Sequence, residues 1–120
     1  LDAAEQLLDL PEPPTAIFSS NDDMAAATVA IAHRRGLDVP GDLTVCGFDD
    51  TTLATAIWPE LTTIHQPIAD MARAAVELLV VTLRQQKRLD GAVEQQVLDY
   101  TLIRRQSDAP PRRRPRALGA

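Results

Sequence analysis

Two short apolar runs with an alanine-rich stretch between them dominate the hydrophobic pattern in the first half of the chain. The runs over 15–19 (TAIFS) and 43–48 (LTVCGF) are apolar without alternation, which predicts two strands of a parallel sheet covered on both faces. Between them, Asp22 to Arg35 has helical spacing and ends before Gly36, a residue type that commonly follows a helix. The pattern predicts an α/β fold built on a strand–helix–strand unit of the size of a βαβ crossover.

The remaining segments continue this pattern on both sides of the unit. A first helical stretch is ended by three prolines, because proline lacks an N–H and restricts the residue before it. These are Pro11, Pro13 and Pro14. Pro67 suits the first position of a long helix, where the missing N–H has no helical partner. The predicted elements are a helix over 1–9, a short helix over about 52–57, an extended run over 61–66, a helix from Pro67 to about Arg88 and a strand over 93–104.

Two polar residues follow the predicted carboxyl ends of the two apolar strands. Asn21 comes two residues after the first strand, and Asp49 directly follows the second. Ligands of open parallel sheets bind beyond the carboxyl ends of the strands, where an amide and a carboxylate can hydrogen-bond the hydroxyls of a small polar ligand. Both residues also stand where a helix N-cap is expected, which is the commoner role. The two interpretations are compatible, because Asp22 or Asp50 can cap the helix instead.

The composition is that of an ordinary globular domain and excludes several functions. Hydrophobic residues make up 45% and charged residues 24% of the 120 positions, and no apolar stretch approaches the roughly 18 residues of a membrane span. The single cysteine excludes an internal disulfide. Aromatic residues, at 3%, leave no stacking platform for single-stranded nucleic acid.

The charge is unevenly distributed along the chain. The net charge is −5, but residues 104–120 carry six arginines and one aspartate, so residues 1–103 carry −10. An acidic body of this kind binds the DNA backbone poorly. From Gln106 the composition turns to proline and arginine, which predicts a disordered tail over 106–120. The tail arginines are interpreted as a solvated end, with contacts to DNA phosphates as the alternative.

Other candidate chemistry is weakly supported. Asp49 and Asp50 have no third oxygen ligand at a recognisable spacing, so a metal or phosphoacceptor pair is disfavoured. His33 and His65 lack a metal-binding neighbour and are interpreted as structural, and Cys46 as a small buried hydrophobe. Glycine motifs of nucleotide-binding proteins and hydrolases are absent. We therefore predict no metal site and no cofactor.

The alanine-rich helix is apolar on more than one side. The positions beyond a single core-facing stripe are Thr28, Val29, Ile31 and Ala32. A partner surface and burial under a neighbouring segment explain them equally well. Trp58, at the end of the short helix, either lies in an interface or covers the edge of the sheet.

Three stretches, in this order, carry a resemblance to a known family. They are PTAIFSSNDDMAAATVAIAHRRGLDVPGDLTVCGFDDTTLA (Pro14–Ala54), PELTTIHQPIADMARAAVELL (Pro59–Leu79) and LIRRQS (Leu102–Ser107). The strand followed by Asn-Asp and Met-Ala, the Gly-Phe-Asp-Asp turn and the Leu-Thr-Thr-Ile-x-Gln-Pro segment recur as an ordered set. The chain thus resembles the effector-binding domain of the LacI/GalR family of bacterial transcriptional regulators.

This resemblance implies a three-layer, periplasmic-binding-protein-like (type I) architecture of two α/β subdomains. A small effector, a sugar or sugar-like metabolite, is expected in the cleft between them, with Asn21 and Asp49 facing it. The segment Leu61–Gln66 is expected to cross between the subdomains. The helix from Asp22 and the segment Leu53–Trp58 are expected to form a homodimer surface.

We expect residues 1–105 to be the C-terminal portion of such a domain, because the chain opens inside a helix and both the DNA-binding head and the first part of the domain are absent. The expected function is that of a cytoplasmic, non-membrane repressor whose effector controls operator binding through that head. This regulation requires no covalent chemistry, so no enzymatic activity is expected. An exported sugar-binding transport protein of the same fold stays open as an alternative. A receiver domain phosphorylated on Asp49 or Asp50 is disfavoured, because the single lysine, Lys87, lies near the end of a helix.

Overall fold

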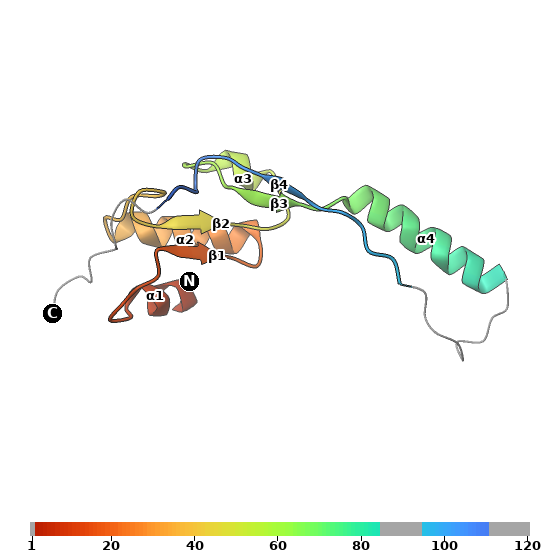
Figure 1. Cartoon of the computed structure of the whole chain (residues 1–120), viewed down its shortest axis with the longest axis horizontal. Coiled ribbons are helices and arrows are strands. Elements are labelled where there is room, and N and C mark those ends of the chain that lie inside the picture. Colours follow the sequence, from red (N-terminus) through yellow and green to blue (C-terminus); the bar gives the residue numbers. More distant parts are fainter. Residues whose placement is uncertain (1, 85–94, 111–120) are drawn as a thin grey trace. The chain divides into compact units, whose positions relative to one another are not determined.

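The computed structural model describes residues 2–84 and 95–110 and divides the chain into two compact units. Unit 1 comprises Leu1–His65 and Thr101–Ala120, and unit 2 comprises Gln66–Tyr100. In the order shown in Figure 1, the elements of the described residues are α1 (Asp2–Leu8), β1 (Ala16–Phe18), α2 (Asp22–Arg34), β2 (Thr44–Cys46), α3 (Leu53–Ala56), β3 (Thr63–His65), α4 (Ile68–Arg84) and β4 (Thr101–Ile103).

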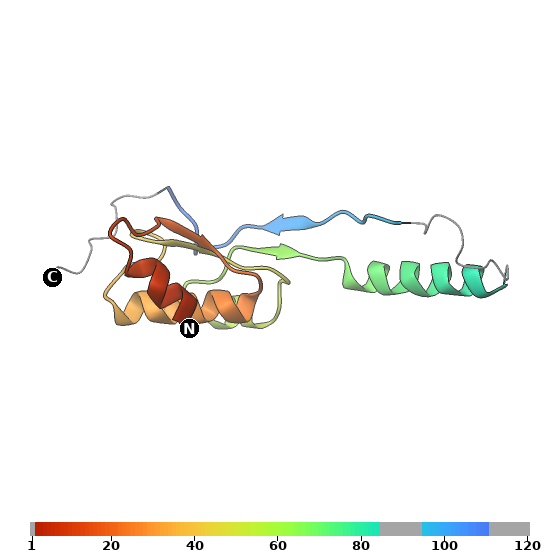
Figure 2. The ribbon, with the colours of Figure 1, turned by 90° about the horizontal axis from the view of Figure 1, so that it is seen from below.

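The first two strands and the helix between them confirm the predicted strand–helix–strand unit. β1 and β2 pair in parallel, with Ile17 opposite Val45 and Phe18 opposite Cys46. A parallel pair needs a crossover connection, since a tight turn cannot return the chain in the same direction. Here α2 makes that connection, and Figure 2 shows it running along one side of the two strands.

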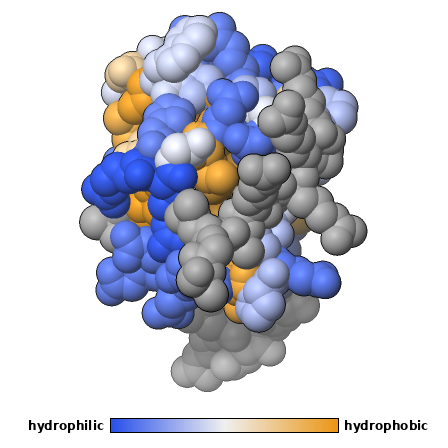
Figure 3. Space-filling view, turned by 90° about the vertical axis from the view of Figure 1, so that its left-hand side faces the viewer, coloured by the Kyte–Doolittle hydropathy of each residue, from blue (hydrophilic) through white to orange (hydrophobic). Residues whose placement is uncertain are grey.

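The ends of α2 follow from its capping residues. Oδ1 of Asn21 accepts a hydrogen bond of 2.8 Å from the backbone N–H of Met24, which makes Asn21 the N-cap. At the other end Gly36 has φ +72°, the left-handed conformation that terminates many helices. His33 and Arg34 occupy the last turn, and this end of unit 1 presents mainly hydrophilic side chains (Figure 3).

The hydrophobic core of unit 1 lies between its helices and the strand β2. Val45 of β2 is fully buried, and Leu8 of α1 and Ala54 of α3 belong to the same cluster. The α2 members of the cluster are Ala25, Val29, Ile31 and Ala32. Since Val29, Ile31 and Ala32 are buried together with Thr28, burial under neighbouring segments accounts for the second apolar side of this helix.

The prediction that both faces of the sheet are covered is wrong for β1. The burial pattern of this strand is exposed, half-buried, exposed, and Phe18 is 65% exposed. The apolar side chains of the helices gather on the side of Ile17 and Val45, so the described residues leave the other face of β1 open.

Two further strands extend unit 1 beyond the carboxyl end of β2. β3 pairs antiparallel with β4, with Ile64 opposite Leu102. Parallel bridges join Cys46 to Thr62 and Asp49 to His65, so the segment that leads into β3 continues the sheet beside β2. The predicted last strand over 93–104 is shorter than expected: β4 spans Thr101–Ile103, residues 95–100 are exposed and irregular, and residues 93–94 lie outside the described part.

The prediction of disorder from Gln106 onward is wrong for the residues as far as Ala109. Ser107 is fully buried; its carbonyl accepts from the N–H of Val45 at 2.9 Å, and its hydroxyl accepts from the N–H of Thr62 at 2.9 Å. The carbonyl of Ala109 accepts from the hydroxyl of Thr44 at 2.8 Å. These bonds fill the open edge of β2, which composition alone does not reveal. Residues 111–120 lie outside the described part.

Unit 2 contains α4 and the exposed segment that precedes β4. None of the residues of α4 from Ile68 to Arg84 is buried, although its apolar side chains recur at helical spacing. The predicted continuation to Arg88 lies outside the described residues. Among the described helices none is both long enough and apolar enough to cross a membrane.

Candidate functional site

The two predicted ligand-binding residues stand beyond the same edge of the sheet. Phe18 and Cys46 are register partners at the carboxyl ends of β1 and β2. Asn21 lies three positions after Phe18, and Asp49 lies three positions after Cys46. Because the strands are parallel, both residues lie beyond the carboxyl edge, where open α/β sheets bind their ligands.

Asn21 combines a structural role with a place at a surface hollow. Its Oδ1 caps α2, which confirms the capping interpretation for this residue. It also lines a hollow of about 470 Å³ formed by α1, the end of β1 and the start of α2. Apolar walls come from Leu7, Phe18 and Met24. With Oδ1 engaged, the amide NH₂ is the part of Asn21 that suits a ligand, as a donor.

Asp49 lies in a turn of unusual backbone geometry. Its φ is +110° and that of Asp50 is +55°, a left-handed conformation that costs about 1–3 kcal/mol for a residue other than glycine. The N–H of Asp49 donates to the carbonyl of Ile64 at 2.9 Å, which ties the turn to β3. Asp49 does not cap the next helix, because the N-cap of α3 is Thr52, and this residue makes no side-chain capping bond. Strained backbone of this kind tends to occur at functional sites.

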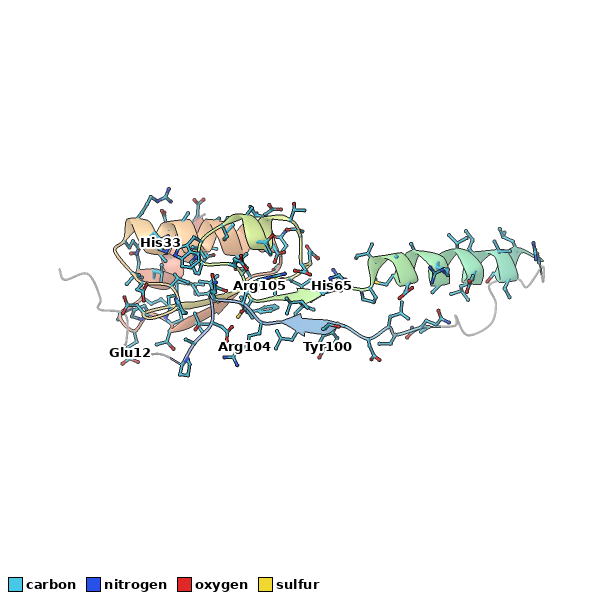
Figure 4. All side chains as sticks on the ribbon, turned by 90° about the horizontal axis from the view of Figure 1, so that it is seen from above. Glu12, His33, His65, Tyr100, Arg104 and Arg105 are labelled. Carbon is cyan, nitrogen blue, oxygen red and sulfur yellow. The ribbon has the colours of Figure 1, made fainter. Side chains whose placement is uncertain are left out.

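The neighbouring carboxylate, Asp50, joins two segments that are distant in sequence. Its Oδ1 accepts from Nη2 of Arg105 at 2.6 Å, and its Oδ2 lies 3.0 Å from Nδ1 of His65. Burial alone would raise the pKa of Asp50, but the hydrogen bonds from Arg105 and His65 hold this pKa below its ordinary value. Figure 4 shows Arg105 and His65 on the same part of unit 1. Asp50 is thus an ionised structural group, which further disfavours a phosphoacceptor role.

Asp22 is the residue of this region that sequence reasoning misjudged. It is fully buried, and its carboxylate accepts hydrogen bonds from the N–H of Thr51 at 2.7 Å and the hydroxyl of Thr63 at 2.6 Å. The sequence pattern predicts Asp22 only as a possible cap of α2. The available signal was helical spacing, since positions 22, 25, 29 and 32 share the core-facing side of α2.

The remaining candidate residues take structural or surface positions. Cys46 is half-buried, and this burial raises the pKa of its thiol, so it is no activated nucleophile. His33 is exposed, whereas His65 pairs with Asp50. The described ranges contain no cluster of three side chains that could hold a metal ion.

The expected dimer surface is partly apolar and open in the described chain. Trp58 is 73% exposed, although Leu53 and Ile57 beside it are half-buried. On α2, Met24 is 55% exposed and Ala30 is exposed. The open positions of α2 therefore differ from Thr28, Val29, Ile31 and Ala32, the positions that the sequence pattern indicated.

Comparison with known proteins places these features in a family. The profile of the periplasmic binding protein-like domain matches residues 1–107. The HTH-type transcriptional repressor CytR of Escherichia coli (strain K12) is 43% identical over 105 residues, which cover 88% of this chain and 30% of the repressor.

Solved structures of related regulators share the fold. The complex of the transcriptional regulator CelR with cellobiose has a TM-score of 0.80 and 31% identity, covering 89% of this chain and 32% of that one. A LacI family transcriptional regulator from Lactobacillus casei with bound sucrose has a TM-score of 0.70 and 34% identity, covering 89% and 38%. The chain spans about a third of the length of these relatives. It belongs to the periplasmic binding protein-like domain family, in the form found in LacI-family transcriptional regulators.

Proposed function

We propose that this chain forms part of the sugar-binding domain of a DNA-binding transcriptional regulator, and that Asn21 and Asp49 contact the sugar. The observation that carries the proposal is the placement of both side chains beyond the carboxyl edge of the β1–β2 pair. The bound cellobiose and sucrose of the two related structures support a sugar or sugar-like metabolite as effector.

The chemistry of the two side chains suits sugar hydroxyl groups. A hydroxyl both donates and accepts a hydrogen bond. The carboxylate of Asp49 accepts from one hydroxyl, and the NH₂ of Asn21 donates to the oxygen of another, because its Oδ1 is already bonded to Met24. A charged acceptor strengthens such a bond relative to a neutral pair. This pairing requires no metal, no cofactor and no covalent step, so the proposed protein is a regulator without enzymatic activity.

Regulation follows from the connections between the two units. The chain passes from unit 1 into unit 2 after β3 and returns to unit 1 at β4. Asp49 is bonded to Ile64 of β3, so a sugar held by Asp49 acts next to one of these connections. A sugar that binds one arrangement of the domain better than another shifts the population towards that arrangement, and DNA binding changes with it.

Dimerisation and DNA binding complete the proposal. We propose a homodimer through the open side of α2 and the segment Leu53–Trp58, where the exposed Trp58 supplies the kind of aromatic anchor that interfaces favour. Residues 1–103 carry a net charge of −10, so operator DNA is bound by a part of the protein outside this chain. The repressors among the relatives favour a cytoplasmic regulator over an exported transport protein.

The experiment uses the complete gene product with cellobiose and sucrose, the sugars bound in the two related structures, as probes. Isothermal titration identifies a sugar that binds, and the operator affinity is measured with and without that sugar. Asp49→Ala is expected to weaken sugar binding about tenfold or more through loss of a charge-assisted hydrogen bond, with sugar-free operator affinity unchanged. The matched control is Glu12→Ala, which removes an exposed carboxylate that does not line the hollow beside Asn21. Equal sugar affinities in Asp49→Ala and the unaltered protein contradict the assignment.

A further inference from the structure

The buried carboxylate of Asp22 makes contacts that the proposed sugar binding does not itself use. Asp22 is the first residue of α2 and is fully buried. Its Oδ2 accepts from both the N–H of Thr51, at 2.7 Å, and the hydroxyl of Thr51, at 3.1 Å. Its Oδ1 accepts from the hydroxyl of Thr63 at 2.6 Å. One carboxylate therefore joins α2, the turn that contains Asp49 and the strand β3.

The turn after β2 needs such contacts to keep its shape. Asp49 and Asp50 are consecutive non-glycine residues with positive φ, and a strained backbone persists only where the surrounding structure holds it. Thr51, bonded twice to Asp22, follows them directly. The turn is thus anchored to the start of α2 immediately after the strained pair.

The segment beside the turn is anchored by the same carboxylate. The N–H of Asp49 donates to the carbonyl of Ile64. Thr63, the residue before Ile64, is bonded to Oδ1 of Asp22. The strand that receives the hydrogen bond from Asp49 is therefore positioned by Asp22 as well.

The chain that enters the turn also passes against Asp22. A methyl group added at Gly47 would lie 2.3 Å from Oδ1 of Asp22 and 3.3 Å from the Cβ of Ala25. Only glycine allows this close approach. Asp22 contacts the chain before, after and beside Asp49, yet its complete burial leaves it no surface for a ligand.

We infer that Asp22 is the positioning residue of the proposed sugar site: its carboxylate holds the 49–51 turn and β3 in the arrangement in which Asp49 binds a sugar hydroxyl. The inference rests on the proposed function of Asp49. Asp22 acts through Asp49 and does not touch the sugar. The loss of the Asp22 carboxylate is therefore expected to lower sugar affinity by no more than the loss of the Asp49 carboxylate does.

The first measurement needs no sugar and follows amide hydrogen exchange in the complete gene product. In Asp22→Ala the N–H of Thr51 loses its acceptor, so its exchange is expected to accelerate about tenfold or more. Asp22→Asn retains one acceptor oxygen and is expected to give an intermediate rate. Asp23→Ala, which removes the adjacent exposed carboxylate, is the matched control and leaves the Thr51 rate unchanged. An unchanged Thr51 rate in Asp22→Ala overturns the inference.

The second measurement is a double-mutant cycle of sugar affinity with Asp22→Ala and Asp49→Ala. Coupled residues give non-additive effects, so the double variant is expected to bind as weakly as Asp49→Ala alone. Additive losses overturn the inference. If none of the probe sugars binds the unaltered protein, the proposed function fails, and the exchange of Thr51 alone decides whether Asp22 positions the turn. If Asp22→Ala does not fold, Asp22→Asn takes its place in the exchange measurement, because it alters the acceptor of the Thr51 N–H. Thr63→Val, which removes a single hydrogen bond to the same carboxylate, takes its place in the double-mutant cycle.

Discussion

Asp50 and Arg105, which stand 55 positions apart in the sequence, form an ion pair of 2.6 Å in which both side chains are more than four-fifths buried. The pair connects the turn after β2 to the segment after β4, and Arg105 also donates to the carbonyl of Leu61 at 2.8 Å. Unit 1 is assembled from two parts of the chain, and this pair is one of the contacts that join them.

Removal of the arginine from this pair is expected to destabilise unit 1. Arg105→Gln removes the ion-pair partner of the partly buried carboxylate of Asp50 and leaves the contact with Nδ1 of His65, at a cost of about 1–3 kcal/mol in the free energy of unfolding. Arg104→Gln is the matched control: Arg104 pairs with Asp108 but is 67% exposed, so solvent screens this pair and its loss is expected to cost less than the loss of Arg105. Urea unfolding of both variants compares the costs, and equal losses contradict the prediction.

Unit 1 is expected to lose stability in acid. Burial raises the pKa of Asp50 and of Asp108, but hydrogen bonds from Arg105 and His65 to the first and from Thr62 and Arg104 to the second hold both pKa values below the ordinary range. The unfolded chain then takes up protons first as the pH falls. The stabilisation is complete above the ordinary aspartate pKa of about 3.9 and is lost as the pH falls through the lowered values of the folded state.

The measurement is the urea midpoint as a function of pH. It is expected to stay level between about pH 7 and 5 and to decline below about pH 4, because the two carboxylates must be ionised to hold their partners. Asp50→Asn is expected to make the decline shallower. A decline of the same slope in this variant excludes Asp50 as its source.

Substitution of Gly47 is expected to be costly for a steric reason. Gly47→Ala places a methyl group 2.3 Å from Oδ1 of Asp22, and relief of this clash costs about 1–3 kcal/mol. Gly36→Ala meets no atom within 4 Å and is disfavoured only by its positive φ, at about 1 kcal/mol. In the Asp22→Ala background the cost of Gly47→Ala is expected to shrink, whereas that of Gly36→Ala persists. Thermal unfolding of the single and double variants tests this.

Two substitutions of Asn21 separate its capping role from its proposed contact with the sugar. Asn21→Asp keeps an oxygen for the N–H of Met24 and is expected to retain stability, but it loses the NH₂ donor and therefore sugar affinity. Asn21→Ala loses the cap as well and is expected to cost about 1 kcal/mol of stability. Sugar titration and urea unfolding measure the two effects. If Asn21→Asp binds the sugar as tightly as the unaltered protein does, the amide of Asn21 does not contact the sugar.

The proposed dimer depends on the exposed Trp58. Trp58→Ser is expected to weaken dimerisation of the complete gene product at least about tenfold, since aromatic anchors dominate interface energies. The fold is expected to be retained because the side chain is 73% exposed. Phe18→Ser, which replaces a 65% exposed aromatic residue outside the proposed surface, is the control. Sedimentation velocity gives the oligomeric state, and an unchanged dimer in Trp58→Ser contradicts this surface.

Local signals in the sequence were sufficient for the strand–helix–strand unit and for the ends of α2, but not for the ends of β4. The apolar runs predicted β1 and β2, and the asparagine before Asp22 and the glycine at 36 predicted where α2 begins and ends. These features arise from interactions within a few residues, such as a cap or a left-handed terminal residue, and can therefore be predicted from the local sequence. The same holds for the position of Asn21 and Asp49 after the two strands.

The partners of the charged residues were decided by the tertiary structure. Composition placed Ser107 in a disordered tail, whereas an open edge of β2, formed by residues far earlier in the chain, binds it. Likewise Asn21, Asp22 and Asp23 stand side by side at the start of α2, and only the packing of the helix against the sheet showed that Asp22 is the one directed to Thr51 and Thr63. Hydrogen bonds between distant segments depend on the register of the folded chain, and no local pattern encodes that register.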